Sequence, residues 1–270
     1  MSNENWIGKE ARKKKAEDHI KEIEKYAALT EASIKSSIIY PDNNGTKVVP
    51  GTAKETKIIV EDIDSVSAIY KYDNRRREEE PYNKICVLNF ASYKNPGGAF
   101  LNGAIAQEEA LCHESNLYPV ISAFMDQFYN PNKKNLNKAL YNNNLIYSPN
   151  VVFLKDYMLF CDVITAAAPN KKAAQKYCNV TSEEVNKIMK ERIDHVLFAA
   201  YQNRVDTLIL GAYGCGVFGN NPTDVAHIFN HYLQKKYKNI FSIVIFAIPK
   251  GRNDRNFDAF KNIFDGMNLS

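Results

Sequence analysis

The sequence predicts an α/β fold with a mixed, mostly parallel sheet that is covered by helices on both faces. Short apolar runs typical of buried strands alternate with segments of helical periodicity, and this alternation favours parallel strands joined by crossover helices. Two glycine-bearing loops, residues 89–109 and 211–221, each leave a predicted strand and enter a predicted helix. A charged stretch at residues 5–40 precedes the alternating part and predicts an N-terminal helical extension.

Two regions follow from this pattern. Residues 1–50 are predicted to form the helical extension and its linker, and residues 51–270 are predicted to form one α/β domain. The stretch 5–40 has no proline and no glycine after Gly8, and its apolar residues form a partial stripe at helical spacing. The turn-forming residues at 41–51 predict the linker between the two regions.

The strands and first helices of the domain follow in order. Six apolar runs predict strands at residues 57–61, 85–90, 151–154, 159–167, 207–210 and 240–248. A helix is expected to begin near Ala106 and to break at Pro119, and a second helix is expected to reach about residue 128. Residues 130–144 are rich in Asn and Lys, which predicts a long polar loop.

Capping signals mark the later helices. Thr181 and Glu184 have the spacing of a capping box, and apolar residues then repeat at helical period. Asn221 is a suitable N-cap, and Pro222 suits the first position of a helix that runs to about residue 236. A last helix is predicted at about residues 256–264.

Composition excludes several classes of protein. The chain has 270 residues, of which 45% are apolar and 24% charged, as in a globular protein. A net charge of +4 is too small to imply nucleic-acid binding by itself, and acidic neighbours nearly cancel the basic run at residues 12–15. No apolar run approaches the roughly 18 residues of a membrane span, and the polar N-terminus lacks the apolar segment of a secretory signal.

The cysteines and histidines give no sign of a metal site. Five cysteines are scattered without a C-x-x-C pair, which favours reduced thiols and a cytoplasmic location. His227 and His231 are four residues apart on a predicted helix, but no third ligand accompanies them, so a surface or half-buried role is favoured. We therefore predict no metal and no cofactor.

The first glycine loop has features that suit a sugar ligand. Gly97 can take a positive φ in a tight turn, Gly98 keeps the backbone bare, and the Asn95 amide can bond to sugar hydroxyls. Glu108 and Glu109 then fall in the first turn of the next helix. The helix dipole stabilises such acids by about 0.3–1 kcal/mol, so a purely structural role remains an alternative for the pair considered alone.

The second loop suits a diphosphate. Gly214, Gly216 and Gly219 match the G-x-G-x-x-G pattern of dinucleotide-binding enzymes, but those also need an acid about 20 residues on, and residues 234–242 contain none. Backbone N–H groups at 216–219 can still receive phosphate. In parallel sheets, ligands bind beyond the carboxyl ends of the strands, so both loops are predicted to line one crevice.

These motifs resemble those of a known family. Two glycines and Ala99, followed by Gln107-Glu108-Glu109, resemble the signature of the microbial-type poly(ADP-ribose) glycohydrolases, a branch of the macrodomain fold. Residues 214–220 are similar to that family's diphosphate-binding loop, and the resemblance extends from about Thr46 to the C-terminus. The family usually has three consecutive glycines, and Ala99 stands in place of the third.

The resemblance implies a macrodomain-like hydrolase that cleaves ADP-ribose O-glycosidic linkages, chiefly the ribose–ribose bonds of poly(ADP-ribose). In this interpretation, Glu109 protonates the leaving ribose oxygen and then activates water, and Glu108 positions a ribose hydroxyl. The implied partners are ADP-ribose or poly(ADP-ribose) on modified macromolecules, with no membrane, and direct nucleic-acid binding is left open. The implied ligand-binding residues are Asn95, Gly97, Gly98, Ala99, Gln107, Gly214, Gly216, Val217, Phe218 and Gly219.

Physical chemistry leaves two points open. Adjacent helix residues point about 100° apart, so Glu108 and Glu109 cannot flank a bond as an ordinary glycosidase pair does. A general acid also needs a raised pKa, whereas a helix N-terminus lowers it, so repulsion or burial must reverse that effect. Two alternatives therefore stand: a non-catalytic ADP-ribose reader, which the Cβ of Ala99 would favour, and a hydrolase that removes single ADP-ribose groups from protein or nucleic acid.

Overall fold

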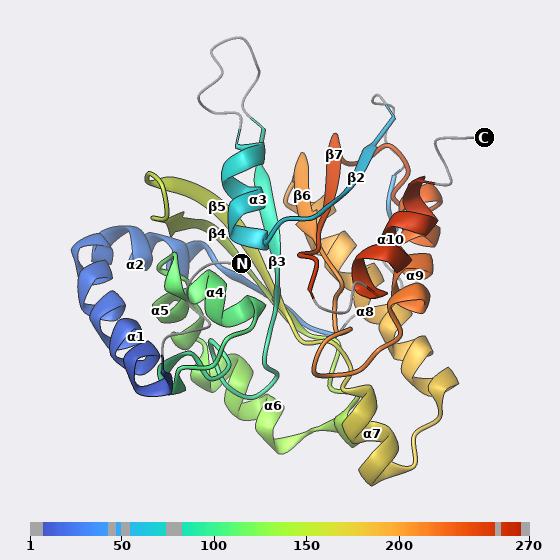
Figure 1. Ribbon diagram of the computed structural model, residues 1–270, viewed down its shortest axis with the longest axis horizontal. Helices are drawn as coiled ribbons and strands as arrows, with labels where there is room; N and C mark the ends of the chain where they lie inside the picture. The colour runs from blue at the N-terminus through green and yellow to red at the C-terminus, as the bar shows by residue number, and fades with distance from the viewer. Residues whose placement is uncertain (1–7, 43–46, 50–54, 74–82, 252–254, 266–270) are drawn as a thin grey trace.

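The computed structural model describes residues 8–42, 47–49, 55–73, 83–251 and 255–265 (Figure 1). Its centre is a seven-stranded sheet with the order β1-β4-β5-β3-β6-β7-β2. The strands are β1 (Ile38–Tyr40), β2 (Lys57–Glu61), β3 (Ile85–Phe90), β4 (Leu145–Phe153), β5 (Leu159–Ala166), β6 (Thr207–Leu210) and β7 (Ile243–Ala247). The pairings from β5 through β3, β6 and β7 to β2 are parallel, and those of β4 with β1 and β5 are antiparallel. The predicted mixed, mostly parallel sheet is confirmed.

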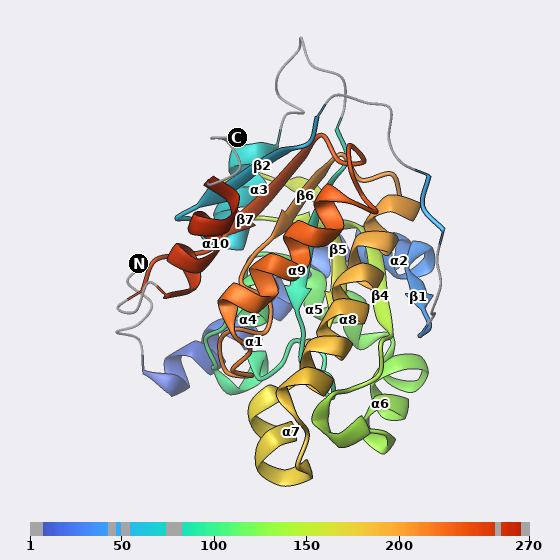
Figure 2. The ribbon, with the colours of Figure 1, turned by 90° about the vertical axis from the view of Figure 1, so that its right-hand side faces the viewer.

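Helices cover both faces of this sheet. They are α1 (Lys9–Ile23), α2 (Ala27–Ser36), α3 (Ser65–Tyr72), α4 (Gln107–His113), α5 (Leu117–Ser122), α6 (Asn130–Lys134), α7 (Lys171–Cys178), α8 (Ser182–Gln202), α9 (Pro222–Gln234) and α10 (Arg255–Asp265). Helices α8, α9 and α10 cover one face, as Figure 2 shows, and share a core with alternate residues of β3 such as Cys86 and Leu88. The other face packs Ile85 and Val87 against α3, α4 and α5. Because successive strand residues point to opposite faces, β3 contributes to both cores.

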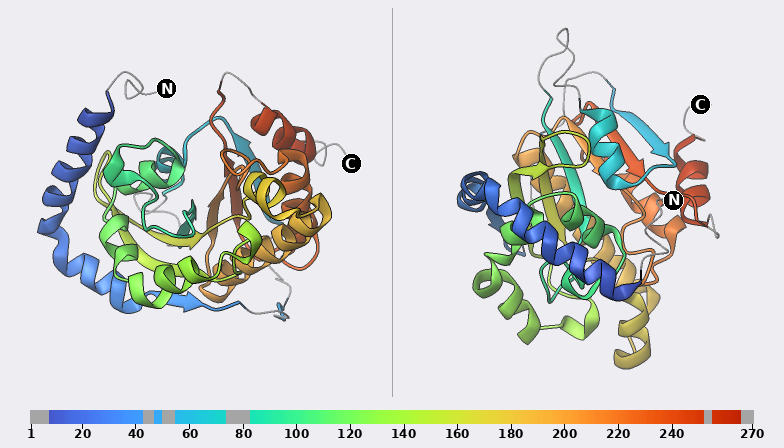
Figure 3. Two further views of the ribbon diagram at one scale, coloured as in Figure 1. Left: turned by 90° about the horizontal axis from the view of Figure 1, so that it is seen from below. Right: turned by 60° about the vertical axis from the view of Figure 1, so that its left-hand side comes forward.

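The N-terminal segment is helical for most of its length but ends as a strand. A single 3₁₀ turn at Glu24–Tyr26 separates α1 from α2, and β1 then pairs with β4 at the edge of the sheet. Figure 3 shows α1 and α2 along one side of the domain. The predicted boundary near residue 50 stays a prediction, but residues 38–40 belong to the same sheet as the rest.

Several elements match their predicted positions closely. The observed β2, β3 and β6 have the predicted bounds, and α9 and α10 lie within two residues of theirs. The predicted capping box at the start of α8 is present, because the Thr181 hydroxyl accepts from Glu184 N at 3.2 Å and the Glu184 carboxylate accepts from Thr181 N at 2.7 Å.

Other elements differ from the prediction. The predicted polar loop at 130–144 contains α6 and a short 3₁₀ turn, Asn137–Ala139, and β4 begins six residues before its predicted start. Pro119 does not break a helix but lies in the first turn of α5, where a missing N–H costs nothing. Helices α3 and α7 were not predicted from the sequence.

Candidate active site

A pocket of about 580 Å³ opens at the carboxyl edge of the sheet. Residues after β3, β6 and β7 line it, together with the first turns of α3 and α4. The left panel of Figure 3 views the molecule from below, toward this edge. Residues of both glycine loops line the same pocket, as the sequence predicts, and the remaining lining comes from Ala91, Ala168, Ala212, Ala247, Ile248, Pro249 and Asn256 among others.

The first loop is a series of tight turns. Gly98 N donates to Asn95 O at 3.1 Å, and Phe100 N donates to Gly97 O at 3.0 Å. Gly97 and Gly98 have φ values of 65° and 62°, which other residues rarely adopt. Ala99 has a φ of −116°, so a side chain at the third position introduces no backbone strain.

The loop holds the Glu109 carboxylate directly. Ala99 N donates to Glu109 Oε1 at 2.9 Å. A Cβ on Gly98 would lie 2.6 Å from Glu109 Oε1 and 3.1 Å from Glu108 Oε2, so the two carboxylates pack against this bare backbone. Glu109 is only 6% exposed, although it lies beside an open pocket.

Glu108 is buried more deeply. Its Oε2 accepts from Ser92 N at 2.7 Å, and its Oε1 accepts from Asn89 Nδ2 at 3.3 Å. Burial raises the pKa of Glu108 to about 8; repulsion from Glu109 adds to this rise, and the two donated hydrogen bonds oppose it. Burial therefore favours the protonated form of Glu108 at neutral pH.

Asn89 can accommodate that proton. Its Oδ1 has no hydrogen-bond partner among the described residues, while its Nδ2 faces Glu108 Oε1. The oxygen and nitrogen of an amide are assigned from their surroundings, so a turned amide presents Oδ1 as an acceptor for a protonated Glu108. The Asn89–Glu108 contact thus suits either protonation state of the carboxyl group.

Gln107 fixes α4 against the sheet. Its Oε1 accepts from Phe90 N at 2.9 Å, and its Nε2 donates to Leu88 O at 2.8 Å and to Ser65 Oγ at 3.1 Å. The side chain ties the end of β3 to the starts of α3 and α4. Its observed contacts hold the turn that places Glu108 and Glu109.

The second loop needs glycine at two positions. Gly214 has a φ of 73°, and a Cβ there would lie 2.6 Å from Ala168 Cβ and 2.7 Å from Asn220 Nδ2. Gly219 has a φ of 72°, and the stem of Lys172 covers it, with Cγ 2.7 Å from a Cβ built at that position. Gly216 has open space around it, and the backbone there is exposed.

An aromatic group supports one wall of the pocket. Phe218 lines the pocket and meets Tyr141 edge-on, with ring centroids 6.1 Å apart. Tyr141 in turn stacks on Tyr93 at 4.2 Å. The carbonyl of Tyr141 accepts from the fully buried Arg192 at 3.4 Å, which anchors this wall to α8.

The predicted site residues fall into two groups. Those that line the pocket are Gly98, Gln107, Glu108, Glu109, Gly214, Gly216, Val217 and Phe218. Outside the lining are Asn95, which is exposed at the turn, Gly97, which packs on Tyr118, Ala99, and Gly219 under Lys172. Contact of these residues with a ligand stays a prediction.

Sequence reasoning missed the backbone and polar groups that hold the carboxylates. Asn89 was the start of the predicted loop, and a polar residue that ends an otherwise apolar strand was an available signal for its role. The residue type of Ser92 gave no indication of its role, because the bond to Glu108 comes from the backbone N–H, which every residue except proline has. Asp62, which follows β2, accepts from Lys250 N at 2.7 Å and lies outside the pocket lining.

No group of three or more His, Cys, Asp and Glu side chains within the described ranges is arranged to hold a metal ion. No helix in the part of the chain that the structure describes is long and apolar enough to span a membrane.

Comparison with known proteins points to one family. The family model for the catalytic domain of microbial-type PARG matches residues 11–156. The poly(ADP-ribose) glycohydrolase from Thermomonospora curvata is 28% identical with a TM-score of 0.81, over 94% of this chain and 100% of that one. Its complex with the inhibitor ADP-HPD gives the same identity and TM-score, over 94% and 99%. The Deinococcus radiodurans poly(ADP-ribose) glycohydrolase with bound ADP-ribose is 31% identical with a TM-score of 0.79, over 88% and 98%. A search of curated proteins found no match.

Proposed function

This chain belongs to the microbial-type poly(ADP-ribose) glycohydrolase family, and we propose that Glu109 is the residue that cleaves its substrate. The fold is macrodomain-like, and the chain is a glycosidase that hydrolyses ADP-ribose O-glycosidic linkages. We propose that the ribose–ribose bond of poly(ADP-ribose) is the bond cleaved. The observation that carries this proposal is the buried Glu109 carboxylate, fixed by Ala99 N at 2.9 Å and facing the pocket that the phosphate-binding loop also lines.

The proposed ligand position follows from the two loops. The diphosphate lies against the loop at 216–219, where Gly216 and Val217 are exposed and a Cβ on Gly216 would meet open space. Phe218 borders the adjacent sugar or base. The terminal ribose then extends toward Glu109, whose carboxylate occupies the space that the missing side chain of Gly98 leaves.

The proposed reaction uses one carboxyl group twice. Protonated Glu109 gives its proton to the leaving ribose oxygen while the C1–O bond breaks, and the sugar becomes oxocarbenium-like. The resulting carboxylate accepts a proton from water as the water oxygen bonds to C1. The products are ADP-ribose and a polymer shortened by one unit, and Glu109 regains its proton.

Glu108 supplies a proton to this pair. Neighbouring buried carboxyl groups titrate as a unit, and burial keeps a proton on Glu108 at neutral pH. Substrate that excludes water from the pocket raises the cost of two adjacent negative charges further. We propose that the pair enters the reaction with at least one proton, that Glu109 delivers it, and that Glu108 bonds to a ribose hydroxyl.

The geometry favours an enzyme over a reader. Ala99 keeps an ordinary backbone conformation, so its Cβ does not distort the loop, and its N–H holds Glu109 in place. Burying two adjacent carboxyl groups carries a cost in stability that simple binding of ADP-ribose does not require. We therefore propose catalysis rather than ligand capture alone.

The test compares two matched variants at adjacent positions. Wild type should release ADP-ribose from poly(ADP-ribose), and Glu109→Gln should lower kcat by about a thousandfold while it retains ADP-ribose affinity. Glu108→Gln should mainly weaken substrate binding. If Glu109→Gln releases ADP-ribose at the wild-type rate, Glu109 is not the catalytic acid. If wild type binds ADP-ribose tightly but releases none from poly(ADP-ribose), the protein is a non-catalytic reader.

ADP-ribose carried on modified macromolecules is the proposed partner, because the relatives with solved structures are poly(ADP-ribose) glycohydrolases and one of them binds ADP-ribose. A cytoplasmic location is proposed from the five cysteines, none of which forms a disulfide in the structure. Assay of defined mono-ADP-ribosylated protein and nucleic acid tests the remaining substrates.

A further inference from the structure

We infer that helix α1 supports the catalytic loop, and that Arg12 on this helix is a positioning residue for Glu109. The inference rests on the proposed function, because it takes Glu109 as the acid. The sequence predicted α1 as part of an extension outside the catalytic domain. The contacts of α1 with the first glycine loop give it a different role.

Arg12 bonds to the far end of that loop. Its Nε donates to Gly103 O at 2.7 Å, across 91 residues of sequence, and the side chain is half-buried. Gly103 has a φ of 69° and ends the 3₁₀ turn Phe100–Asn102. A Cβ on Gly103 would lie 2.6 Å from Lys9 O and 3.2 Å from Arg12 Cβ, so the α1 backbone lies directly against the loop.

A short chain of hydrogen bonds leads from Gly103 to the carboxylate. Gly103 N donates to Phe100 O at 3.1 Å, and Ala104 N donates to Ala99 O at 3.2 Å. Ala99 N then donates to Glu109 Oε1 at 2.9 Å. The segment that receives the Arg12 bond is therefore the segment that fixes Glu109.

A second contact holds the same segment from inside. The Phe100 ring is 1% exposed and meets the His113 ring edge-on at 4.6 Å and the His19 ring of α1 at 6.4 Å. His19 Nε2 also lies 2.8 Å from Ser115 O, just after α4. Ala16, between Arg12 and His19, is fully buried in the same core as Phe100. Helix α1 thus contacts the loop and the end of the catalytic helix over two turns.

Loss of this support should affect the chemical step more than binding. Displacement of a catalytic group by about 1 Å can lower a rate strongly, whereas the proposed diphosphate and base contacts come from the second loop and the ends of β6 and β7. A merely structural role for Arg12 would instead lower the folded fraction and leave kcat per folded molecule unchanged.

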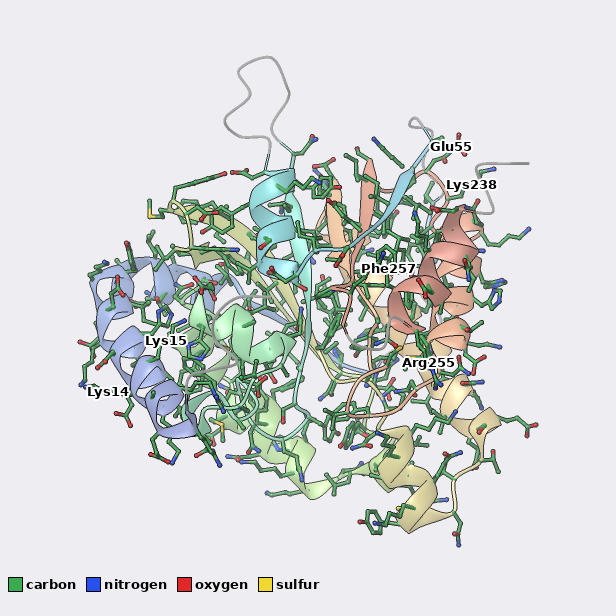
Figure 4. All side chains as sticks on the ribbon, in the orientation of Figure 1. Lys14, Lys15, Glu55, Lys238, Arg255 and Phe257 are labelled. Atoms are coloured by element: carbon green, nitrogen blue, oxygen red, sulfur yellow. The ribbon has the colours of Figure 1, made fainter. Side chains whose placement is uncertain are left out.

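The experiment compares Arg12→Ala, Arg12→Lys and Lys14→Ala in the full chain. Lys14 lies on the same helix, as Figure 4 shows, and is exposed. Arg12→Ala should lower kcat by about tenfold while ADP-ribose affinity changes by less than about threefold. Arg12→Lys, which keeps a donor for Gly103 O, should recover part of kcat, and Lys14→Ala should match wild type.

Hydrogen exchange gives a readout that does not depend on activity. The amides of Ala99, Gly103 and Ala104 should exchange faster in Arg12→Ala than in wild type, with no such change in Lys14→Ala. Unchanged exchange and unchanged kcat in Arg12→Ala would overturn the inference, as would equal effects of Arg12→Ala and Lys14→Ala. If wild type proves inactive on poly(ADP-ribose), the proposed function fails. Faster loop exchange in Arg12→Ala would then still show that α1 supports the loop, but not that Arg12 positions a catalytic acid.

Discussion

A Cβ atom on Gly98 would lie 2.6 Å from Oε1 of Glu109, so the carboxylate occupies the space that any larger residue at 98 would need. The glycine has a φ of 62°, so two independent features exclude a side chain there. The loop and Glu109 therefore do more than line the same pocket, because the conformation of the loop at Gly98 determines the position of the Glu109 carboxylate.

Gly98→Ala should therefore abolish most activity. The new methyl group must displace the Glu109 carboxylate or the loop, which removes the bond from Ala99 N. We expect kcat/KM to fall by at least about a hundredfold and the free energy of unfolding to fall by about 1–2 kcal/mol. Steady-state kinetics and urea denaturation measure the two effects, and near-normal activity would contradict this account of the loop.

Ala99→Gly, one residue on, should behave differently. The φ of −116° at Ala99 suits either residue, and glycine keeps the N–H that bonds to Glu109. We expect activity to stay within a few-fold of wild type and stability to fall slightly, by about 0.5–1 kcal/mol, because glycine makes the unfolded chain more flexible. Loss of activity comparable to that of Gly98→Ala would show that Ala99 acts through its side chain.

The buried Glu108 predicts how stability depends on pH. Its pKa is about 8 when folded and 4.5 in the reference state, so between these values the folded protein binds the extra proton. The contribution of Glu108 to the free energy of unfolding therefore falls as pH rises from about 5 to about 8. Glu108→Gln lacks the titration, and its stability relative to wild type should rise by roughly 3–5 kcal/mol over that range.

Denaturation of wild type and Glu108→Gln at several pH values measures this difference. Asn89 has an oxygen without a hydrogen-bond partner in the described structure, so its amide can turn to accept from the new Gln side chain. Parallel pH profiles for the two proteins would mean that Glu108 ionises as an exposed carboxyl group does.

Lys172 should contribute charge to the second glycine loop, where we propose that the diphosphate binds. Its Cγ, Cδ and Cε lie 2.7, 3.1 and 2.8 Å from a Cβ built on Gly219, and its N–H donates to Phe218 O at 3.1 Å. Lys172→Met keeps the stem and removes the ammonium group. We expect ADP-ribose affinity to fall by about three- to tenfold, with no change for uncharged adenosine.

Calorimetric titration of both ligands separates charge from packing. The matched control is Lys176→Met, on the same helix, where the ammonium lies 5.0 Å from the Tyr177 ring centroid. Equal losses for ADP-ribose and adenosine in Lys172→Met would indicate that the loop has moved rather than that a charge was lost.

The sequence predicts the parallel core well because its signals are local. Continuous apolar runs identify β2, β3 and β6, and the caps at Thr181 and Asn221 identify the starts of α8 and α9. Each signal needs only a few neighbouring residues. The two glycine loops follow such strands, and loops that follow parallel strands lie at the same edge of the sheet. The position of the pocket could therefore be predicted.

The errors arose where tertiary contacts override local signals. Pro149 and Asn150 interrupt the apolar pattern of β4, yet the strand continues through a register shift between Ser148 and Val151, with Asn150 at a φ of 55°. Three residues at 38–40 are too few for a periodic signal, and they form a strand only because β4 offers an edge. A bulge and an edge pairing depend on partners far away in sequence.

The same limit applies to the site. Residue types identified both carboxylates and the glycines, but the groups that position them are the backbone of Ser92 and Ala99 and an arginine near the N-terminus. Resemblance assigned to Glu109 the role of general acid, which needs a raised pKa, whereas burial raises the pKa of Glu108. The burial of each carboxyl group determines which pKa is raised, and burial is known only from the folded structure.

Strands β1 and β2 are consecutive in the chain but lie at opposite edges of the sheet, about 29 Å apart at the usual strand spacing. During translation, β2 (Lys57–Glu61) leaves the ribosome long before β7 (Ile243–Ala247), the strand with which it pairs. The nascent polypeptide must therefore keep an apolar segment unpaired through most of its synthesis. Truncations that remove β7 would leave that segment without its neighbour and expose it to self-association.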